Sequence, residues 1–108
     1  MQLPLHHIIE AIENFAPLAL QEKYDNAGLL VGNPQQIVSK ALLTLDCTEE
    51  TIEEAIAHQC DLIIAHHPII FTGIKSITGK SFVERILIKA IQQNIAIYAA
   101  HTNLDNIH

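Results

Sequence analysis

The stretch DLIIAHHP, residues 61–68, decides the fold. Its four apolar residues, Leu62–Ala65, are typical of a short strand buried on both faces. Two adjacent histidines, His66 and His67, follow this run, and Pro68 then prevents the sheet from continuing. One histidine after a buried strand is common, whereas two histidines stopped by a proline indicate a functional site at the strand end.

Strands of this kind alternate with amphipathic helices along the chain. Apolar spacing and a capping box of Ser81 and Glu84 predict three helices, at Leu3–Phe15, Thr48–His58 and Ser81–Gln93. Three strands are predicted at Ala41–Leu45, Leu62–Ala65 and Ile95–Ala100, and the segment Tyr24–Pro34 predicts a loop with a short strand or hairpin arm. Strands that are apolar on both faces and joined through helices predict an α/β fold: a mostly parallel sheet, built from βαβ units and covered by helices on both faces.

Composition narrows the possible functions. The chain has 108 residues, enough for one α/β domain, and a net charge of −6, which argues against binding nucleic acid. No apolar run is long enough for a membrane span, and the N-terminus does not resemble a signal peptide, so we expect a cytoplasmic protein without membrane contacts. Cys47 and Cys60 form no CxxC pair, and we expect two reduced thiols in or near the core.

Polar residues collect where the predicted strands end. Asp46, His66, His67 and His101 each follow a strand, and Asp105 lies four residues further on. The carboxyl ends of parallel strands meet at one edge of a sheet, where ligands of such folds bind. Imidazole and carboxylate suit Zn, Fe, Mn or Co. Because adjacent side chains of an extended strand point to opposite faces, the two neighbouring histidines are expected to face two different ions rather than chelate one.

Simpler roles compete with metal binding at each of these positions. For Asp46 we favour the simpler role, the N-cap of the helix that follows from Cys47. The other candidates could be local caps or hydrogen-bonded polar groups. Four histidines have no comparable placement and are expected to lie on the surface: His6, His7, His58 and His108.

A segment that resembles a nucleotide-binding loop fails on its spacing. GIKSITGKS, residues 73–81, has five residues between its first glycine and Gly-Lys-Ser, where the phosphate-binding loop requires four. It also does not directly follow a strand. The helix that begins at Ser81 could still hold an anion, as any helix N-terminus can.

Three motifs together resemble one protein family. YDNAGLLVG (24–32), HHPIIFTGIKSI (66–77) and AAHTNLDN (99–106) resemble, in this order, the dinuclear-metal proteins called GTP cyclohydrolase 1 type 2 homologues. The resemblance covers essentially the whole chain. It differs at Tyr24, where the family usually has tryptophan, and in length, because family members are more than twice as long.

The resemblance implies a toroidal homohexamer with two metal ions per subunit that face an internal cavity. By residue match it implies three metal ligands, His66, His67 and Asp105. His101 and Asp25 resemble residues that line the same pocket, and Lys75 resembles a basic position beside it. The remaining ligands of the family, a histidine and a glutamate, come from a C-terminal segment, so we expect residues 1–108 to be the N-terminal part of a longer metal-binding protein.

Two functions are compatible with this pattern. The first is a metal-dependent hydrolase that acts on a nucleotide or another small phosphorylated compound, with His101 or Asp25 moving protons and Lys75 holding an anion. The second is a non-catalytic metal-binding protein with a regulatory or scaffold role. A structural domain whose histidines only satisfy hydrogen bonds is a third reading, in which the convergence at the strand ends is a coincidence.

Overall fold

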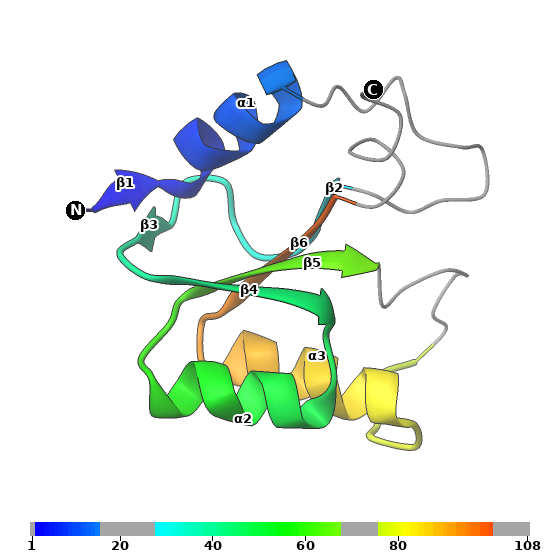
Figure 1. The fold of residues 1–108 in the computed structure, drawn as a ribbon. Coiled ribbons are helices and arrows are strands. Elements are labelled where there is room, and N and C mark those ends of the chain that lie inside the picture. Colours follow the sequence, from blue (N-terminus) through cyan, green and yellow to red (C-terminus); the bar gives the residue numbers. More distant parts are fainter. Residues whose placement is uncertain (1, 16–27, 68–75, 101–108) are drawn as a thin grey trace.

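The computed structural model describes residues 2–15, 28–67 and 76–100. These residues form three helices and six strands (Figure 1). In chain order the elements are β1 (Leu3–Pro4), α1 (Leu5–Phe15), β2 (Gly28–Val31), β3 (Ile37–Val38), β4 (Ala41–Asp46), α2 (Glu49–Ala57), β5 (Leu62–His67), α3 (Phe82–Gln92) and β6 (Ala96–Ala99).

The main sheet has four strands in the order β2-β6-β5-β4. Strand β5 runs parallel to both β4 and β6, and the two connections between these strands carry α2 and α3. Strand β2 pairs with β6 in the antiparallel direction and makes the sheet mixed. The predicted α/β class and the mostly parallel sheet are confirmed, and the short strand expected within Tyr24–Pro34 is β2.

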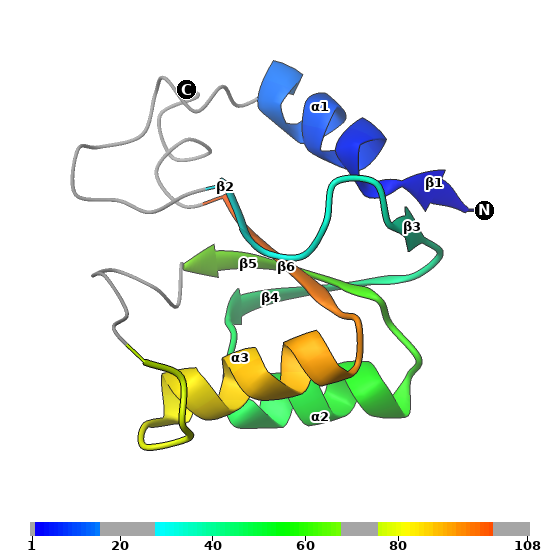
Figure 2. The ribbon, with the colours of Figure 1, turned by 180° about the vertical axis from the view of Figure 1, so that it is seen from behind.

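Helices lie on both faces of the sheet, with α2 and α3 on one side and α1 on the other (Figures 1 and 2). Each face has its own apolar cluster. On the side of α2 and α3, Ile52 and Ile86 pack against Ile63 and Ile97 of the two central strands. On the side of α1, Leu5 packs with Leu62, Ala96 and Tyr98. Because side chains alternate between the two faces along β5 and β6, each of these strands contributes residues to both clusters.

Helix α1 begins two residues later than predicted. Leu3 and Pro4 instead form β1, which pairs with β3 in a separate two-stranded sheet. The backbone N–H groups of Leu5 and His6 donate to the carbonyl oxygens of Gln36 and Pro34, at 2.7 and 2.9 Å. Because these loop carbonyls satisfy the N–H groups that the first turn of a helix leaves unpaired, the helix starts at Leu5.

Helices α2 and α3 end in the same way. In α2, the N–H of Cys60 bonds to the carbonyl of Ala55, and Gln59 has a left-handed backbone with a φ of 59°. In α3, Ile95 bonds to Ala90, and Asn94 has a φ of 56°. Each is a Schellman turn, which satisfies the last carbonyls of the helix and directs the chain into the next strand.

Strand β4 is less covered than predicted. It forms an edge of the sheet, and its side chains alternate between partly buried and exposed. Leu43 and Leu45 are 72% and 68% exposed, so the expectation that all three parallel strands are buried on both faces is wrong for this one. Among the described residues, none of the helices combines the length and apolar character that a membrane crossing requires.

Candidate metal centre

The two adjacent histidines lie at the carboxyl end of β5. The strand runs two residues further than predicted, so His66 and His67 are its last residues rather than the first residues after it. His67 is paired in register with Asp46, the last residue of β4. The polar ends of two neighbouring parallel strands therefore meet at one edge of the sheet, as the sequence predicts.

The rings of His66 and His67 lie close together. Their centroids are 4.8 Å apart, with 57° between the ring planes. The expectation that the two histidines face two different ions stays a prediction.

The side chain of Asp46 contacts His67, and the prediction that it caps α2 is wrong. The N-cap is Thr48, whose hydroxyl accepts a hydrogen bond from the N–H of Thr51 at 3.1 Å. The carboxylate of Asp46 instead reaches across to the neighbouring strand, where its Oδ1 lies 2.7 Å from Nδ1 of His67. The side chains are 65% and 43% exposed, respectively, so this contact forms at the open rim of the sheet.

The backbone of Asp46 is held from two directions. Its carbonyl oxygen accepts hydrogen bonds from the hydroxyls of Thr44, at 2.9 Å, and Thr51, at 3.1 Å. Thr44 belongs to β4 and Thr51 to the first turn of α2. These contacts fix the turn between strand and helix, and so fix the point from which the Asp46 carboxylate starts.

A small cavity lies beside His66. Its volume is about 170 Å³, and it is lined by residues of β4 and β5 and by the residue that follows β6: Leu43, Thr44, Ile64, Ala65, His66 and Ala100. His66 brings an imidazole to an otherwise largely apolar space.

The thiol next to the candidate site is buried and protonated. Cys47 follows Asp46 directly but is only 2% exposed, and burial raises the pKa of its thiol to about 11. Metal ions bind the thiolate form of cysteine. The partly exposed donor groups at this edge are therefore imidazole and carboxylate, which are the groups that Zn, Fe, Mn or Co would accept.

The described residues alone do not form a complete set of metal ligands. In ranges 2–15, 28–67 and 76–100, no group of three or more histidine, cysteine or acidic side chains could hold an ion on its own. The two imidazoles fit the donor chemistry of a divalent metal, and the nearby Asp46 is engaged with one of them. The other predicted site residues, Asp25, Lys75, His101 and Asp105, lie outside the described residues.

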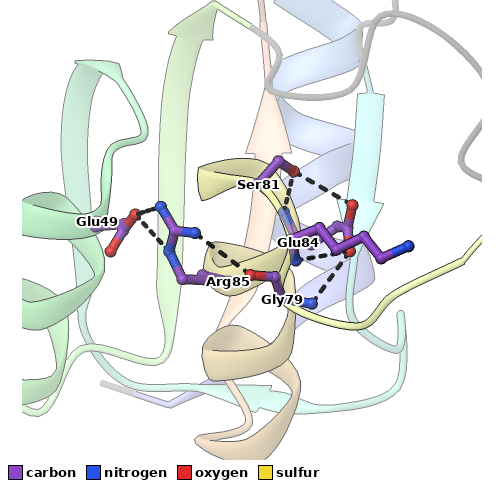
Figure 3. A network of polar contacts seen from close by, with 6 residues as sticks. Glu49, Gly79, Ser81, Glu84 and Arg85 are labelled. Atoms are coloured by element: carbon purple, nitrogen blue, oxygen red, sulfur yellow. Dashed lines mark hydrogen bonds and ion pairs between the residues drawn. The ribbon is translucent and has the colours of Figure 1, made fainter.

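The segment that resembles a phosphate-binding loop binds a carboxylate of its own chain. The backbone N–H groups of Thr78, Gly79 and Lys80 all donate to Oε1 of Glu84, at 2.9, 3.1 and 3.2 Å. Figure 3 shows Gly79 and Glu84 of this group. These bonds, first among them the one from Thr78, lower the pKa of Glu84. Because Glu84 already fills this nest of donors, the rejection of a nucleotide-binding loop here agrees with the structure.

The sequence did not predict the contact between Arg85, near the start of α3, and Glu49. Nε and Nη2 of Arg85 both donate to Oε1 of Glu49, at 2.9 and 2.7 Å, and Nη1 donates to the carbonyl of Gly79 at 3.3 Å (Figure 3). The contact joins the first turns of α2 and α3. Its hydrogen bond to Glu49 raises the pKa of Arg85 and lowers that of Glu49. Only the fold brings these two residues together, so no local pattern could have indicated the pair.

Comparison with known families settles the relationship that the three motifs predicted. Residues 3–108 match the family Duf34/NIF3 (NGG1p interacting factor 3). The chain belongs to the Duf34/NIF3 family. It is 43% identical over 107 residues to a GTP cyclohydrolase 1 type 2 homolog of Clostridium acetobutylicum, which confirms the resemblance stated above.

Solved structures of the Duf34/NIF3 family share the fold. The chain superposes on a Bacillus cereus protein related to NIF3 with a TM-score of 0.89 and 42% identity, over 95% of this chain and 28% of that one. A Staphylococcus aureus protein gives a TM-score of 0.91 with 37% identity, over 95% of this chain and 33% of that one. The match to the Clostridium relative covers 99% of this chain and 40% of the relative, so the chain spans about two fifths of that protein's length.

Proposed function

We propose that this chain contributes the N-terminal ligands of a divalent-metal centre. The observation that carries the proposal is the meeting of two imidazoles and a carboxylate at the ends of β4 and β5, with the rings 4.8 Å apart. Ligands of open α/β sheets bind at this edge. His66, His67 and Asp105 are the proposed metal ligands, and two ions per subunit is the stoichiometry that the resemblance implies.

The activity that this centre supports best is hydrolysis of a nucleotide or another small phosphorylated compound. Bound divalent metal would lower the pKa of a coordinated water and stabilise developing negative charge. Around it, His101 or Asp25 would move protons, and Lys75 would hold an anionic group of the substrate. The only arginine of the chain is engaged with Glu49, which leaves the anion-binding role to lysine.

The names of relatives support this proposal without fixing the substrate. The Clostridium acetobutylicum relative is called a GTP cyclohydrolase 1 type 2 homolog, which names a purine nucleotide. The proposal also includes a homohexameric assembly, which the family resemblance implies, and a cytoplasmic location. We expect no binding of nucleic acid, because the chain carries twelve acidic residues against six basic ones.

A non-catalytic role is the second candidate. The exposure of Leu43 and Leu45 on the edge strand favours it, because apolar side chains beside a metal site suit a surface that another protein segment covers. In this case the metal would organise an assembly or a partner surface. The two candidates share the metal centre and differ only in whether turnover follows.

Turnover measured with and without chelator separates the two. GTP and a panel of nucleoside phosphates are incubated with metal-loaded protein, and products are followed by chromatography. The hydrolase proposal predicts product formation that stops on chelation, returns with metal, and falls at least tenfold in Lys75→Ala. Lys40→Ala is the matched control, because Lys40 lies at the opposite end of β4 from the candidate site. Metal-loaded protein without turnover on any member of the panel would favour the non-catalytic role.

A further inference from the structure

The contact between Asp46 and His67 carries an inference about how the histidine is presented. Oδ1 of Asp46 lies 2.7 Å from Nδ1 of His67, a short distance typical of a hydrogen bond to a charged group. An ionised carboxylate can only accept a hydrogen bond, so Nδ1 of the ring must carry the proton. In the neutral ring the lone pair then lies on Nε2.

We propose that Asp46 is a positioning residue that holds His67 in the Nδ1–H tautomer, so that His67 binds a divalent cation through Nε2. The inference rests on the proposed metal centre and adds a residue to it. A carboxylate behind a metal-binding histidine fixes the orientation of the ring and raises its basicity. Asp46 thus acts on the metal through His67, not as a ligand.

The local structure equips Asp46 for this role. Asp46 in β4 is paired in register with His67 in the parallel strand β5. Its carbonyl oxygen is fixed by the hydroxyls of Thr44 and Thr51. Thr48 caps the N-terminus of α2, so the carboxylate of Asp46 is not needed as a helix cap.

Stability alone does not account for the pair. Both side chains are at the open rim, 65% and 43% exposed, where ion pairs contribute little to folding. Burial does not force the contact either. A role in orienting the ring toward a ligand accounts for a carboxylate and an imidazole held together at this exposed position.

The tautomer of His67 tests the positioning claim without any metal. The chain is labelled with ¹⁵N at histidine, freed of metal with chelator, and studied by NMR at about pH 8, above the ordinary histidine pKa of about 6.5. The signals of His67 are assigned by their loss in His67→Ala. We expect the Nδ1–H form in the unaltered chain and a shift toward the Nε2–H form in Asp46→Ala. Glu50→Gln, which removes an exposed negative charge from the start of α2, is the matched control and should leave the tautomer unchanged.

Zinc affinity tests the consequence for the metal centre. Competition with a chromophoric chelator should give a 10- to 100-fold weaker Zn²⁺ affinity in Asp46→Ala, and no change in Glu50→Gln. If Asp46 acts through His67, the double variant with His67→Ala should bind no more weakly than His67→Ala alone. Circular dichroism of each variant checks that the fold is retained.

The outcomes separate the inference from the proposed function. An Nε2–H ring in the unaltered chain, or the same tautomer in Asp46→Ala, overturns the positioning claim whatever metal is bound. Unchanged zinc affinity in Asp46→Ala also overturns it. Failure of the unaltered chain to bind Zn²⁺ overturns the proposed metal centre and the metal role of Asp46, whereas the tautomer result still decides whether Asp46 orients the ring.

Discussion

The hydroxyl of Tyr98 donates a hydrogen bond to Oε2 of Glu13, 3.0 Å away, and so ties the interior strand β6 to helix α1. Tyr98 is fully buried, and it belongs to the apolar cluster between the sheet and this helix. Burial and the bond to Glu13 raise the pKa of its phenol above the ordinary value of 10.0. The helix that covers one face of the sheet is therefore attached by a polar contact as well as by apolar packing.

Removal of this hydroxyl should loosen α1. We expect Tyr98→Phe to lower the free energy of unfolding by about 1 kcal/mol, because it removes one hydrogen bond and leaves the apolar packing in place. Urea unfolding followed by circular dichroism measures the change. Hydrogen exchange should quicken in α1 more than in α2. Equal exchange in both helices, with unaltered stability, would show that the contact does not attach α1.

The glycine after β2 should tolerate no side chain. Gly32 has a φ of +125°, and an added Cβ would lie 2.8 Å from Cβ of Ala96. We expect Gly32→Ala to cost about 3 kcal/mol through backbone strain and overpacking. Gly79→Ala is the control, because Gly79 also has a positive φ, +87°, but its nearest neighbours would be 3.9 Å away. It should cost about 1–2 kcal/mol. Equal losses in chemical denaturation would mean that close approach to Ala96 is unimportant.

The two cysteines should react only when the protein unfolds. Cys47 and Cys60 are 2% and 6% exposed, and neither is in a disulfide. For Cys47, burial raises the thiol pKa to about 11, which also suppresses the reactive thiolate. A colorimetric thiol reagent should detect two thiols in denaturant, and at least tenfold slower reaction in the native protein. Rapid native labelling of either cysteine would contradict the described packing.

The carboxylate of Glu84 should make the start of α3 sensitive to acid. Its pKa is lowered from 4.5, chiefly by the backbone N–H of Thr78, so the unfolded state takes up the proton first as pH falls. The stabilisation is therefore complete above pH 4.5 and is lost as pH falls through the lower pKa of the folded state. Thermal unfolding of the native chain and of Glu84→Gln should differ at neutral pH, and the difference should shrink below pH 4.5. A difference that stays constant with pH would argue against this contact.

Much of the fold follows from local patterns. The capping box of Ser81 and Glu84 placed the start of α3 correctly, because the hydroxyl of Ser81 does accept from the N–H of Glu84 at 3.3 Å. Runs of aliphatic residues placed β5 and β6, which are the interior strands of the sheet. Both signals are contained within a few neighbouring residues, so the sequence alone displays them.

Properties that depend on sheet order were not predictable in this way. The apolar run Ala41–Leu45 looks like the other two, yet β4 is an edge strand with Leu43 and Leu45 exposed. An aliphatic run does not reveal whether a strand has one neighbour or two. The antiparallel pairing of β2 with β6 depends likewise on contacts between distant segments.

The sequence predicted where the candidate site lies, but it did not predict the contact between Asp46 and His67. The location of His66 and His67 at a strand end follows from the sequence, since parallel strands present their carboxyl ends together. The link between Asp46 and His67 depends on the register of β4 against β5, which no local pattern encodes. Local reasoning favoured a helix cap for Asp46, and a threonine two residues later makes that cap instead.

Metal content tests the central claim most directly. The chain is purified without chelator, and its metal is measured by elemental analysis beside two double variants, His66→Ala/His67→Ala and His6→Ala/His7→Ala. The second is a matched control, because His6 and His7 are also adjacent, with ring centroids 4.5 Å apart, but lie on α1. We predict near-stoichiometric metal in the unaltered chain and in the control, and a loss of at least tenfold in the strand-end variant. Equal metal content in all three proteins, or none in the unaltered chain, would contradict a metal centre at the ends of β4 and β5.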